Sequence, residues 1–310
     1  MMGWARRQLI TLYQQATSPK IGLFLVAMIP LAWLTLFFAV PLLEILGVSL
    51  GSSRRGVPPF IPAWGLSDEG LFFAPNSNSY ALLLRHSSDY LVPLYNSTRL
   101  AFGSMLICLL LAFPIALWAA RARGAVRLSI LVMVLLPFWT SSLLRVYAVM
   151  GLLNPTGYVN QFLLFLGLID TPLDLMRMDV SVYFGIVICY LPLMVLPLYA
   201  VLVRIDESLY EAATDLGATR TTTFMTITLP MARAGIVAGC LLVFIPAMGE
   251  FMIPDLLGGP EQLMMGKVLW AEFFRSRDWP VAAALAVLLL LVLIIPILWL
   301  RHAERRMKET

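Results

Sequence analysis

The residue of this chain with the clearest chemical potential is Glu250, a carboxylate that follows a long uncharged stretch. A charge at membrane depth is costly unless it faces the interior of a helix bundle or a partner. Pro246 and Gly249 permit a local break beside it. Carboxylates and aromatic faces together attract ammonium groups through charge and cation–π interactions. The other candidates to line a path for such a cation are Trp139, Tyr147, Tyr190 and Asp255.

A structural interpretation of Glu250 competes with this one. Arg145 lies near the end of another apolar stretch, and the two opposite charges could form a bridge inside the protein. Such a pair would hold two helices together without touching a substrate. Both interpretations stay open at this point.

Motifs for other chemistry are absent from the sequence. A phosphate-binding loop needs G-x-x-x-x-G-K-[ST], but Gly259 and Gly266 have the wrong spacing and Val268 follows Lys267. Neither of the two histidines has a metal-ligand pattern around it, and no protease or lipase motif is present. We therefore expect no catalytic residue, no metal and no cofactor on this chain. The three cysteines all fall in expected spans, so they indicate no disulfide framework.

The composition is that of an integral membrane protein. Hydrophobic residues make up 60% of the chain and charged residues only 13%, against about a quarter in soluble domains. A spanning helix needs about 20 apolar residues. We expect one membrane domain over 1–310, all helical. Its spans are expected at about 21–48, 95–120, 127–150, 180–203, 233–254 and 279–300, with an external loop at 51–93 and a cytoplasmic loop at 204–232.

Basic residues set the expected orientation. Thirteen of the 22 Lys and Arg residues lie in four segments that a six-span topology puts on one side, and the positive-inside rule assigns that side to the cytoplasm. They are Arg6, Arg7, Lys20, Arg121, Arg123, Arg127, Arg204, Arg220, Arg233, Arg301, Arg305, Arg306 and Lys308. Both termini are then cytoplasmic, and the short apolar stretch 158–169 does not cross. Because these residues flank spans and form no single patch, they argue against nucleic-acid binding.

A polar island separates the fourth and fifth expected spans, and its residues predict two short helices. Asp206 or Ser208 can cap the start of the first helix. Gly217 can end it in a left-handed conformation. Thr219 can cap the second helix, and Pro230 predicts a break before the next apolar run.

The same island resembles the EAA loop of ABC-importer permeases. Glu211-Ala212-Ala213, Gly217 and Leu229-Pro230 match that motif, while Ala234-Gly235 departs from the usual Pro-Gly. In that family the loop is the coupling helix, which docks in a groove of a cytoplasmic ATPase. The resemblance implies an ATPase-coupling role for Glu211, Ala212, Ala213, Gly217, Ala218, Leu229 and Pro230.

Further motifs resemble one branch of these permeases, the spermidine/putrescine importers. They are Leu136-Pro137-Phe138-Trp139-Thr140-Ser141 with Arg145-Val146-Tyr147, the stretch 152–167, and 243–251 with 256–260. The resemblance implies the type I ABC-importer permease fold and a polyamine substrate. The alternatives are another small solute of the same importer class, such as an amino-acid-derived or opine-like compound, an ion-gradient-driven secondary transporter, or a membrane-embedded enzyme.

The resemblance also implies an assembly in the bacterial cytoplasmic membrane. The expected partners are a second, sister permease, two copies of an ABC ATPase that carry ATP and Mg, an external substrate-binding protein, and the lipid bilayer. We expect the external loop 51–93 and the segments 158–169 and 255–279 to form the platform for the binding protein.

Overall fold

The computed structural model describes residues 19–67, 70–260 and 262–308, so Arg6 and Arg7 of the orientation argument lie outside the described residues. The chain divides into two compact units. The first comprises residues 1–81 and 278–287, and the second comprises 82–277 and 288–310. The expectation of an all-helical chain is met over most of its length, and the exception lies in the first unit.

The first unit begins with a long apolar helix. It runs without interruption through α2 (Pro19–Leu34), a π-helical turn η1 (Thr35–Ala39) and α3 (Val40–Ser49). Its residues Val26–Ser49 are long and apolar enough to cross a membrane. This matches the position of the first expected span.

Four short strands follow this helix, where the sequence suggested only a loop. β1 (Ser52–Ser53) pairs antiparallel with β2 (Phe60–Ile61), and β3 (Trp64–Ser67) pairs antiparallel with β4 (Gly70–Phe73). The Trp64 ring stacks on Phe73 at 6.4 Å between centroids and lies so close to Gly47 that a Cβ there would come within 2.9 Å of it. Aromatic packing thus orders part of the 51–93 segment, and the chain is not purely helical.

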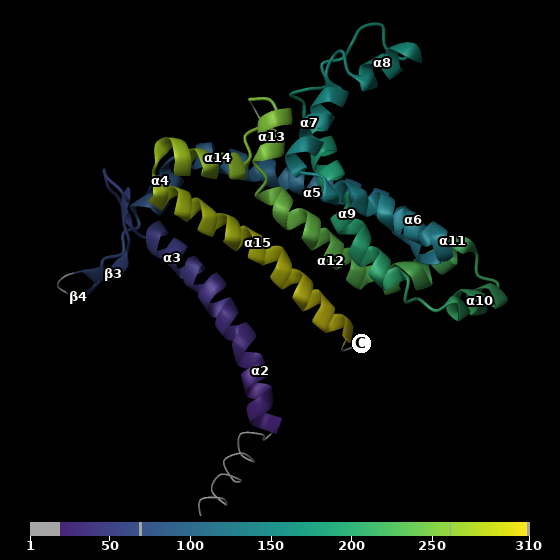
Figure 1. The fold of residues 1–310 in the computed structure, drawn as a ribbon, viewed down its shortest axis with the longest axis horizontal. Helices are drawn as coiled ribbons and strands as arrows, with labels where there is room; N and C mark the ends of the chain where they lie inside the picture. The colour runs from purple at the N-terminus through teal and green to yellow at the C-terminus, as the bar shows by residue number, and fades with distance from the viewer. Residues whose placement is uncertain (1–18, 68–69, 261, 309–310) are drawn as a thin grey trace, which may run out of the picture. The chain divides into compact units, whose positions relative to one another are not determined.

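Three helices form the centre of the second unit. They are α5 (Ser87–Arg121), α9 (Asp179–Leu202) and α12 (Leu229–Met248), and they pack side by side (Figure 1). Gly235 and Gly239 on α12 let α9 approach closely. A Cβ at Gly235 would lie 2.8 Å from the Pro197 carbonyl oxygen, and one at Gly239 would lie 2.5 Å from the Met194 sulfur. This small-x-x-x-small spacing is typical of packed membrane helices.

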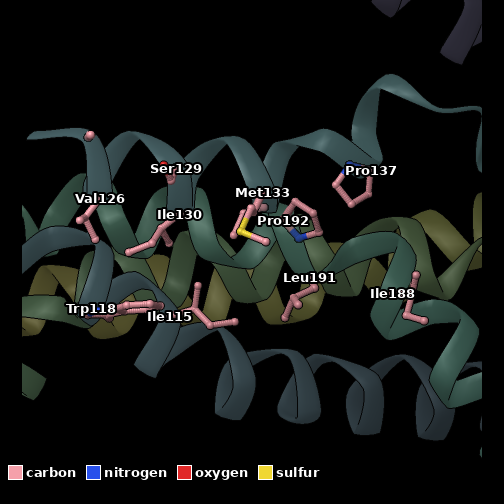
Figure 2. A pocket seen from close by; sticks show the side chains of 12 residues that line it. Ile115, Trp118, Val126, Ser129, Ile130, Met133, Pro137, Ile188, Leu191 and Pro192 are labelled. Carbon is pink, nitrogen blue, oxygen red and sulfur yellow. The ribbon is translucent and has the colours of Figure 1, made fainter. Parts of the chain in front are cut away.

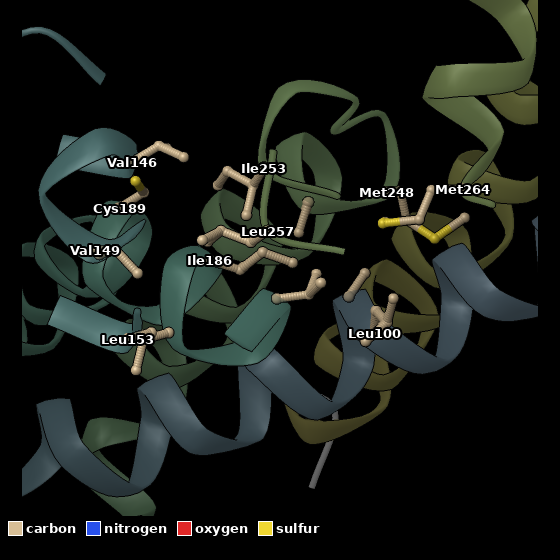
Figure 3. Packing of buried hydrophobic residues seen from close by; sticks show 13 residues of the cluster. Leu100, Val146, Val149, Leu153, Ile186, Cys189, Met248, Ile253, Leu257 and Met264 are labelled. Atoms are coloured by element: carbon tan, nitrogen blue, oxygen red, sulfur yellow. The ribbon is translucent and has the colours of Figure 1, made fainter. Parts of the chain in front are cut away.

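Two buried apolar clusters hold these helices together. Figure 3 shows the first, in which Leu100 of α5, Ile186 of α9 and Met248 of α12 meet residues of two shorter helices. The second cluster lies toward the polar island and includes Ala116, Leu198 and Ala232. Together they fix the positions from which the site residues project.

The third expected span, 127–150, is a broken helix. Its parts are α6 (Gly124–Leu135), a 3-10 turn η2 (Leu136–Trp139) and α7 (Ser142–Leu153), and the path bends by 98° between Trp139 and Ser142. The helix that follows, α8 (Tyr158–Phe165), lies in the stretch 158–169, which is expected not to cross. Pro137 has no amide hydrogen to donate. Thr140 has an extended backbone, and its hydroxyl donates a hydrogen bond to the Pro137 carbonyl at 2.7 Å. The break is therefore built from local backbone chemistry.

The remaining helices are distributed over both units. They are α4 (Asn78–Arg85), α10 (Glu207–Asp215), α11 (Arg220–Thr223), a π-helical turn η3 (Phe224–Thr228), α13 (Met252–Leu257), α14 (Met265–Ala271), a π-helical turn η4 (Glu272–Ser276) and α15 (Trp279–Lys308). Within the described residues, four helices are long and apolar enough to span a membrane, and a fifth is present if the bent pair is one span. The apolar part of α15, Trp279–Ile295, is shorter.

Candidate functional site

The carboxylate of Glu250 lies at the break between α12 and α13, where it binds two parts of the chain. Its Oε1 accepts hydrogen bonds from the amides of Phe251 (3.1 Å), Met252 (3.0 Å) and Ile253 (3.5 Å). Its Oε2 accepts a hydrogen bond from the hydroxyl of Tyr190 on α9. A single half-buried carboxylate therefore caps the first turn of α13 and ties that turn to α9.

Arg145 lies near this carboxylate without an ion pair to it. Its guanidinium donates to the Cys189 carbonyl at 3.3 Å and lies 5.4 Å from the centroid of the Phe138 ring. Its buried Nε has no hydrogen-bond partner. No salt bridge joins Arg145 to Glu250, both of which are described residues, so this conformation lacks the structural bridge considered above.

The other path candidates lie on different elements. Trp139 is 81% exposed and Tyr147 is 50% exposed. Asp255 on α13 forms a salt bridge with Lys267 at 2.8 Å. The structure thus brings Tyr190 and Glu250 into contact. It leaves Trp139 and Tyr147 with exposed aromatic faces, and Asp255 is already paired.

The second unit also contains an apolar groove of about 620 Å³ between α5, α6 and α9 (Figure 2). Trp118, Ile130, Met133 and Leu191 line it, and Ser129 is its only polar residue. A groove without charge suits hydrocarbon and does not suit a hydrated cation. It is therefore separate in character from the Glu250 region.

The polar island folds as two capped helices, as the sequence predicts. The side chain of Asp206 accepts from the Ser208 amide at 3.0 Å at the start of α10. Gly217 has φ +77° after the end of that helix. The hydroxyl of Thr219 accepts from the Thr222 amide at 3.2 Å at the start of α11. The backbone hydrogen bond from Ser208 also lowers the pKa of Asp206 below its ordinary value.

The break expected at Pro230 is absent. Residues Arg220–Met248 form one continuous helix, with the π-helical turn η3 directly before the proline. A π turn shifts the hydrogen-bond pattern from i−4 to i−5, which accommodates a residue that has no amide hydrogen. Proline is thus tolerated here where a regular helix would kink.

The residues matched to the EAA motif differ in exposure. Glu211, Ala212 and Gly217 are exposed, whereas Ala213 faces the bundle and is 9% exposed. Ala218, Leu229 and Pro230 are partly buried. The exposed face of α10 is therefore free, in the described residues, to meet another protein.

Sequence reasoning missed the residues that attach α10 to the bundle. The Arg121 guanidinium lies 4.5 Å from the centroid of the Tyr210 ring. Arg123 forms a salt bridge with Glu207 at 2.8 Å. No local sequence motif predicts these contacts, because each joins residues more than 80 positions apart in the chain.

The sequence matches the model of a known protein family. The family model described as "Binding-protein-dependent transport system inner membrane component" matches residues 112–309, which include the broken span, the polar island and Glu250.

Similar individual proteins come from several bacteria. The spermidine/putrescine transport system permease protein PotB of Salmonella typhimurium is 39% identical over 277 residues, which cover 89% of this chain and 92% of that protein. PotB of Escherichia coli K12 is 38% identical over 277 residues, with 89% and 96% covered.

A similar fold is present in a solved transporter. A chain of the bacterial alginate ABC transporter, in complex with an alginate pentasaccharide-bound periplasmic protein, has a TM-score of 0.69 and 18% identity, and the match covers 96% of this chain and 99% of that one. At this identity the likeness concerns the fold alone.

Proposed function

This chain belongs to the family of binding-protein-dependent transport system inner membrane components, and from that membership we propose that it carries a polyamine, such as putrescine or spermidine, across the membrane. As a member of the family it is a membrane-spanning permease subunit of an ABC importer and not an enzyme. The polyamine substrate is supported by the similarity to PotB over most of both chains.

The topology that we propose has six spans and both termini in the cytoplasm. Helices Ser87–Arg121, Asp179–Leu202 and Arg220–Met248 and the first helix supply four of them. The bent pair supplies the third, and α15 supplies the sixth. The distribution of Lys and Arg supports this orientation.

We propose the following assembly around the chain. A sister permease completes the membrane domain, and two ABC ATPase copies bind ATP and Mg on the cytoplasmic side. An external binding protein delivers the solute. The coupling residues are Glu211, Ala212, Ala213, Gly217, Ala218, Leu229 and Pro230, and the exposed carboxylate of Glu211 suits a basic ATPase side chain.

The observation that carries the substrate proposal is the position of Glu250. Counted from Arg233 it lies 17 residues along the chain, about 25 Å if helical throughout, which places it toward the external end of the fifth span in this topology. Its negative charge sits at a helix break and accepts a hydrogen bond from Tyr190, and the rings of Trp139 and Tyr147, the other aromatic candidates, are exposed. A chain of ammonium groups and methylenes is attracted by such charge and aromatic faces.

Substitution of Glu250→Gln tests this role. The amide keeps the shape and can still accept from the α13 amides, but it removes the charge. Polyamine uptake into proteoliposomes that contain the whole importer should fall about tenfold, the effect of losing roughly 1.4 kcal/mol of attraction. Assembly and basal ATP hydrolysis should persist.

Glu44→Gln is the control, because it removes a carboxylate from the first span and Glu44 is not among the path candidates. We expect it to transport normally. Unchanged uptake kinetics in Glu250→Gln would contradict the substrate role, as would loss of the assembled complex. Binding of a different solute class by the cognate binding protein would contradict the polyamine assignment.

A further inference from the structure

The helix α10 has little apolar packing, and among its residues Tyr210 packs against the second apolar cluster. Ala213 is its only buried residue, while Leu209 is 40% exposed and Leu216, directly after it, is 88% exposed. Two clefts of about 350 and 710 Å³ lie between this part of the chain and the end of α5. The contacts that bridge these clefts must therefore hold α10 in place.

Tyr210 is the side chain that bridges them. It lines both clefts together with Arg121, whose guanidinium lies 4.5 Å from the centre of its ring. Its hydroxyl lies 3.3 Å from Oγ1 of Thr228, a residue that is 1% exposed directly before α12. One tyrosine thus joins α10 to the end of α5 through its ring and to the start of α12 through its hydroxyl.

A second contact joins α10 to the third span. The guanidinium of Arg123 donates to both carboxylate oxygens of Glu207, at 3.0 and 2.8 Å. Arg123 is the N-cap residue directly before α6. Arg127 donates to the carbonyls of Ala120 (3.2 Å) and Ala122 (2.8 Å), so the short link between α5 and α6 is held as one rigid corner.

We propose that Tyr210 is the positioning residue through which movement of α10 reaches α5 and α12, and that the Glu207–Arg123 pair passes the same movement to α6. We call this set of contacts the joint; its residues are Tyr210, Arg121, Thr228, Glu207 and Arg123. The proposal rests on the coupling role of the polar island. It adds residues outside the EAA motif, on both sides of the joint. α6 leads directly to the 98° bend in the third span, so a shift at Arg123 would be passed toward Arg145.

The Arg123–Glu207 pair is weak alone, since its side chains are 80% and 69% exposed and exposed ion pairs contribute little. Together they constrain α10 from three helices. The competing account is that α10 moves the spans only through the peptide chain at its two ends. The two accounts differ in what happens when the chain is intact and the side-chain contacts are removed.

Substitution at Tyr210 separates these accounts. Tyr210→Leu removes the ring and the hydroxyl, and Tyr210→Phe removes only the hydroxyl. In the reconstituted importer we expect solute transported per ATP hydrolysed to fall about fivefold or more in Tyr210→Leu and about twofold in Tyr210→Phe, in line with the loss of a cation–π contact and a hydrogen bond. ATPase binding, measured by co-purification, should remain.

Tyr95→Leu is the control for the substitution itself, because Tyr95 lies on α5 with 67% exposure and outside the joint. It should keep the transport-to-hydrolysis ratio of the unmodified chain. A normal ratio in Tyr210→Leu would overturn the proposal. Loss of ATPase binding in both Tyr210 variants would also overturn it, because the residue would then build the docking surface and not transmit its movement.

The ion pair offers an independent test by exchange of charges. Arg123→Glu and Glu207→Arg should each lower the transport-to-hydrolysis ratio about twofold, the scale of an exposed ion pair, and the double exchange should restore it. Failure of the double exchange to restore the ratio would remove Glu207–Arg123 from the joint. If the unmodified importer hydrolyses ATP without any solute uptake, the proposed function itself fails, a result distinct from any of these.

Discussion

The carboxylate of Glu250 accepts hydrogen bonds from four donors that come from two helices. Three are backbone amides at the start of α13, so the side chain stabilises the first turn of the helix that follows it. The fourth is the Tyr190 hydroxyl, which fixes the carboxylate relative to α9. The same oxygen atoms are therefore part of the local architecture and part of the proposed substrate path.

Tyr190→Phe tests the structural role of the hydrogen bond between Tyr190 and Glu250. It removes one donor to a charged acceptor, and we expect a loss of about 1.5–3 kcal/mol in stability. Thermal unfolding of the detergent-solubilised protein measures it. Tyr158→Phe is the control, since Tyr158 is 75% exposed and its hydroxyl forms no hydrogen bond within the described residues. Equal melting temperatures for the two variants would show that the Tyr190 contact contributes nothing.

Gly217 is the residue of the polar island whose backbone conformation most restricts its identity. Its φ of +77° is in the left-handed region, where a side chain costs about 1–2 kcal/mol and a β-branched one more. We expect Gly217→Val to insert into the membrane but to lose substrate-stimulated ATP hydrolysis, while Gly217→Asn keeps most of it, because Asn tolerates this conformation. Full transport by Gly217→Val in proteoliposomes would contradict the prediction.

At the scale of elements, the sequence predicted what short-range rules determine. A cap at Asp206 or Ser208, a cap at Thr219 and a left-handed Gly217 follow from residue type, and the structure confirms the last two and places the first cap at Asp206. The continuous helix through Pro230 was not predictable, because the π turn that accommodates proline has no sequence signature of its own. Residue types singled out Glu250 and Tyr190 as candidates, but only the fold could show that they touch.

The close approach of α9 and α12 depends on two glycines that differ in what surrounds them. A Cβ at Gly235 would meet backbone atoms of Pro197 and Leu198, whereas the nearest atom to one at Gly239 is the flexible Met194 side chain. Overpacking costs about 1–3 kcal/mol, and backbone yields less than a side chain end. Gly235→Ala should therefore lower the melting temperature in detergent more than Gly239→Ala does. A larger decrease for Gly239→Ala than for Gly235→Ala would contradict this prediction.

Asn160 organises the segment after the broken span. Fully buried, it donates to the carbonyls of Asn154 (3.2 Å) and Leu173 (2.9 Å) and accepts from the Leu173 amide (2.9 Å). Asn160→Leu removes all three bonds, and at about 1 kcal/mol each it should cost about 3 kcal/mol locally. Limited proteolysis should then cleave between residues 154 and 173 faster than in the unmodified protein. Unchanged cleavage would show that the segment is held by other contacts.

For the whole molecule, the orientation of the chain in the membrane can be tested. In intact cells, a membrane-impermeant maleimide should label Asp170→Cys from outside and should label Asp215→Cys only after permeabilisation, in a background with the three native cysteines replaced. The reason is the excess of Lys and Arg on the side of the polar island. External labelling at position 215 would invert the proposed topology.

The hydrogen bonds of Glu250 also have a kinetic consequence. A carboxylate has about four lone-pair sites, and four donors of the chain itself already lie at this one. A passing ammonium would meet the full charge but few free acceptor positions, so its dwell time would be short. Rapid release at this point favours turnover over retention, and it leaves the discrimination between solutes to the protein that delivers them.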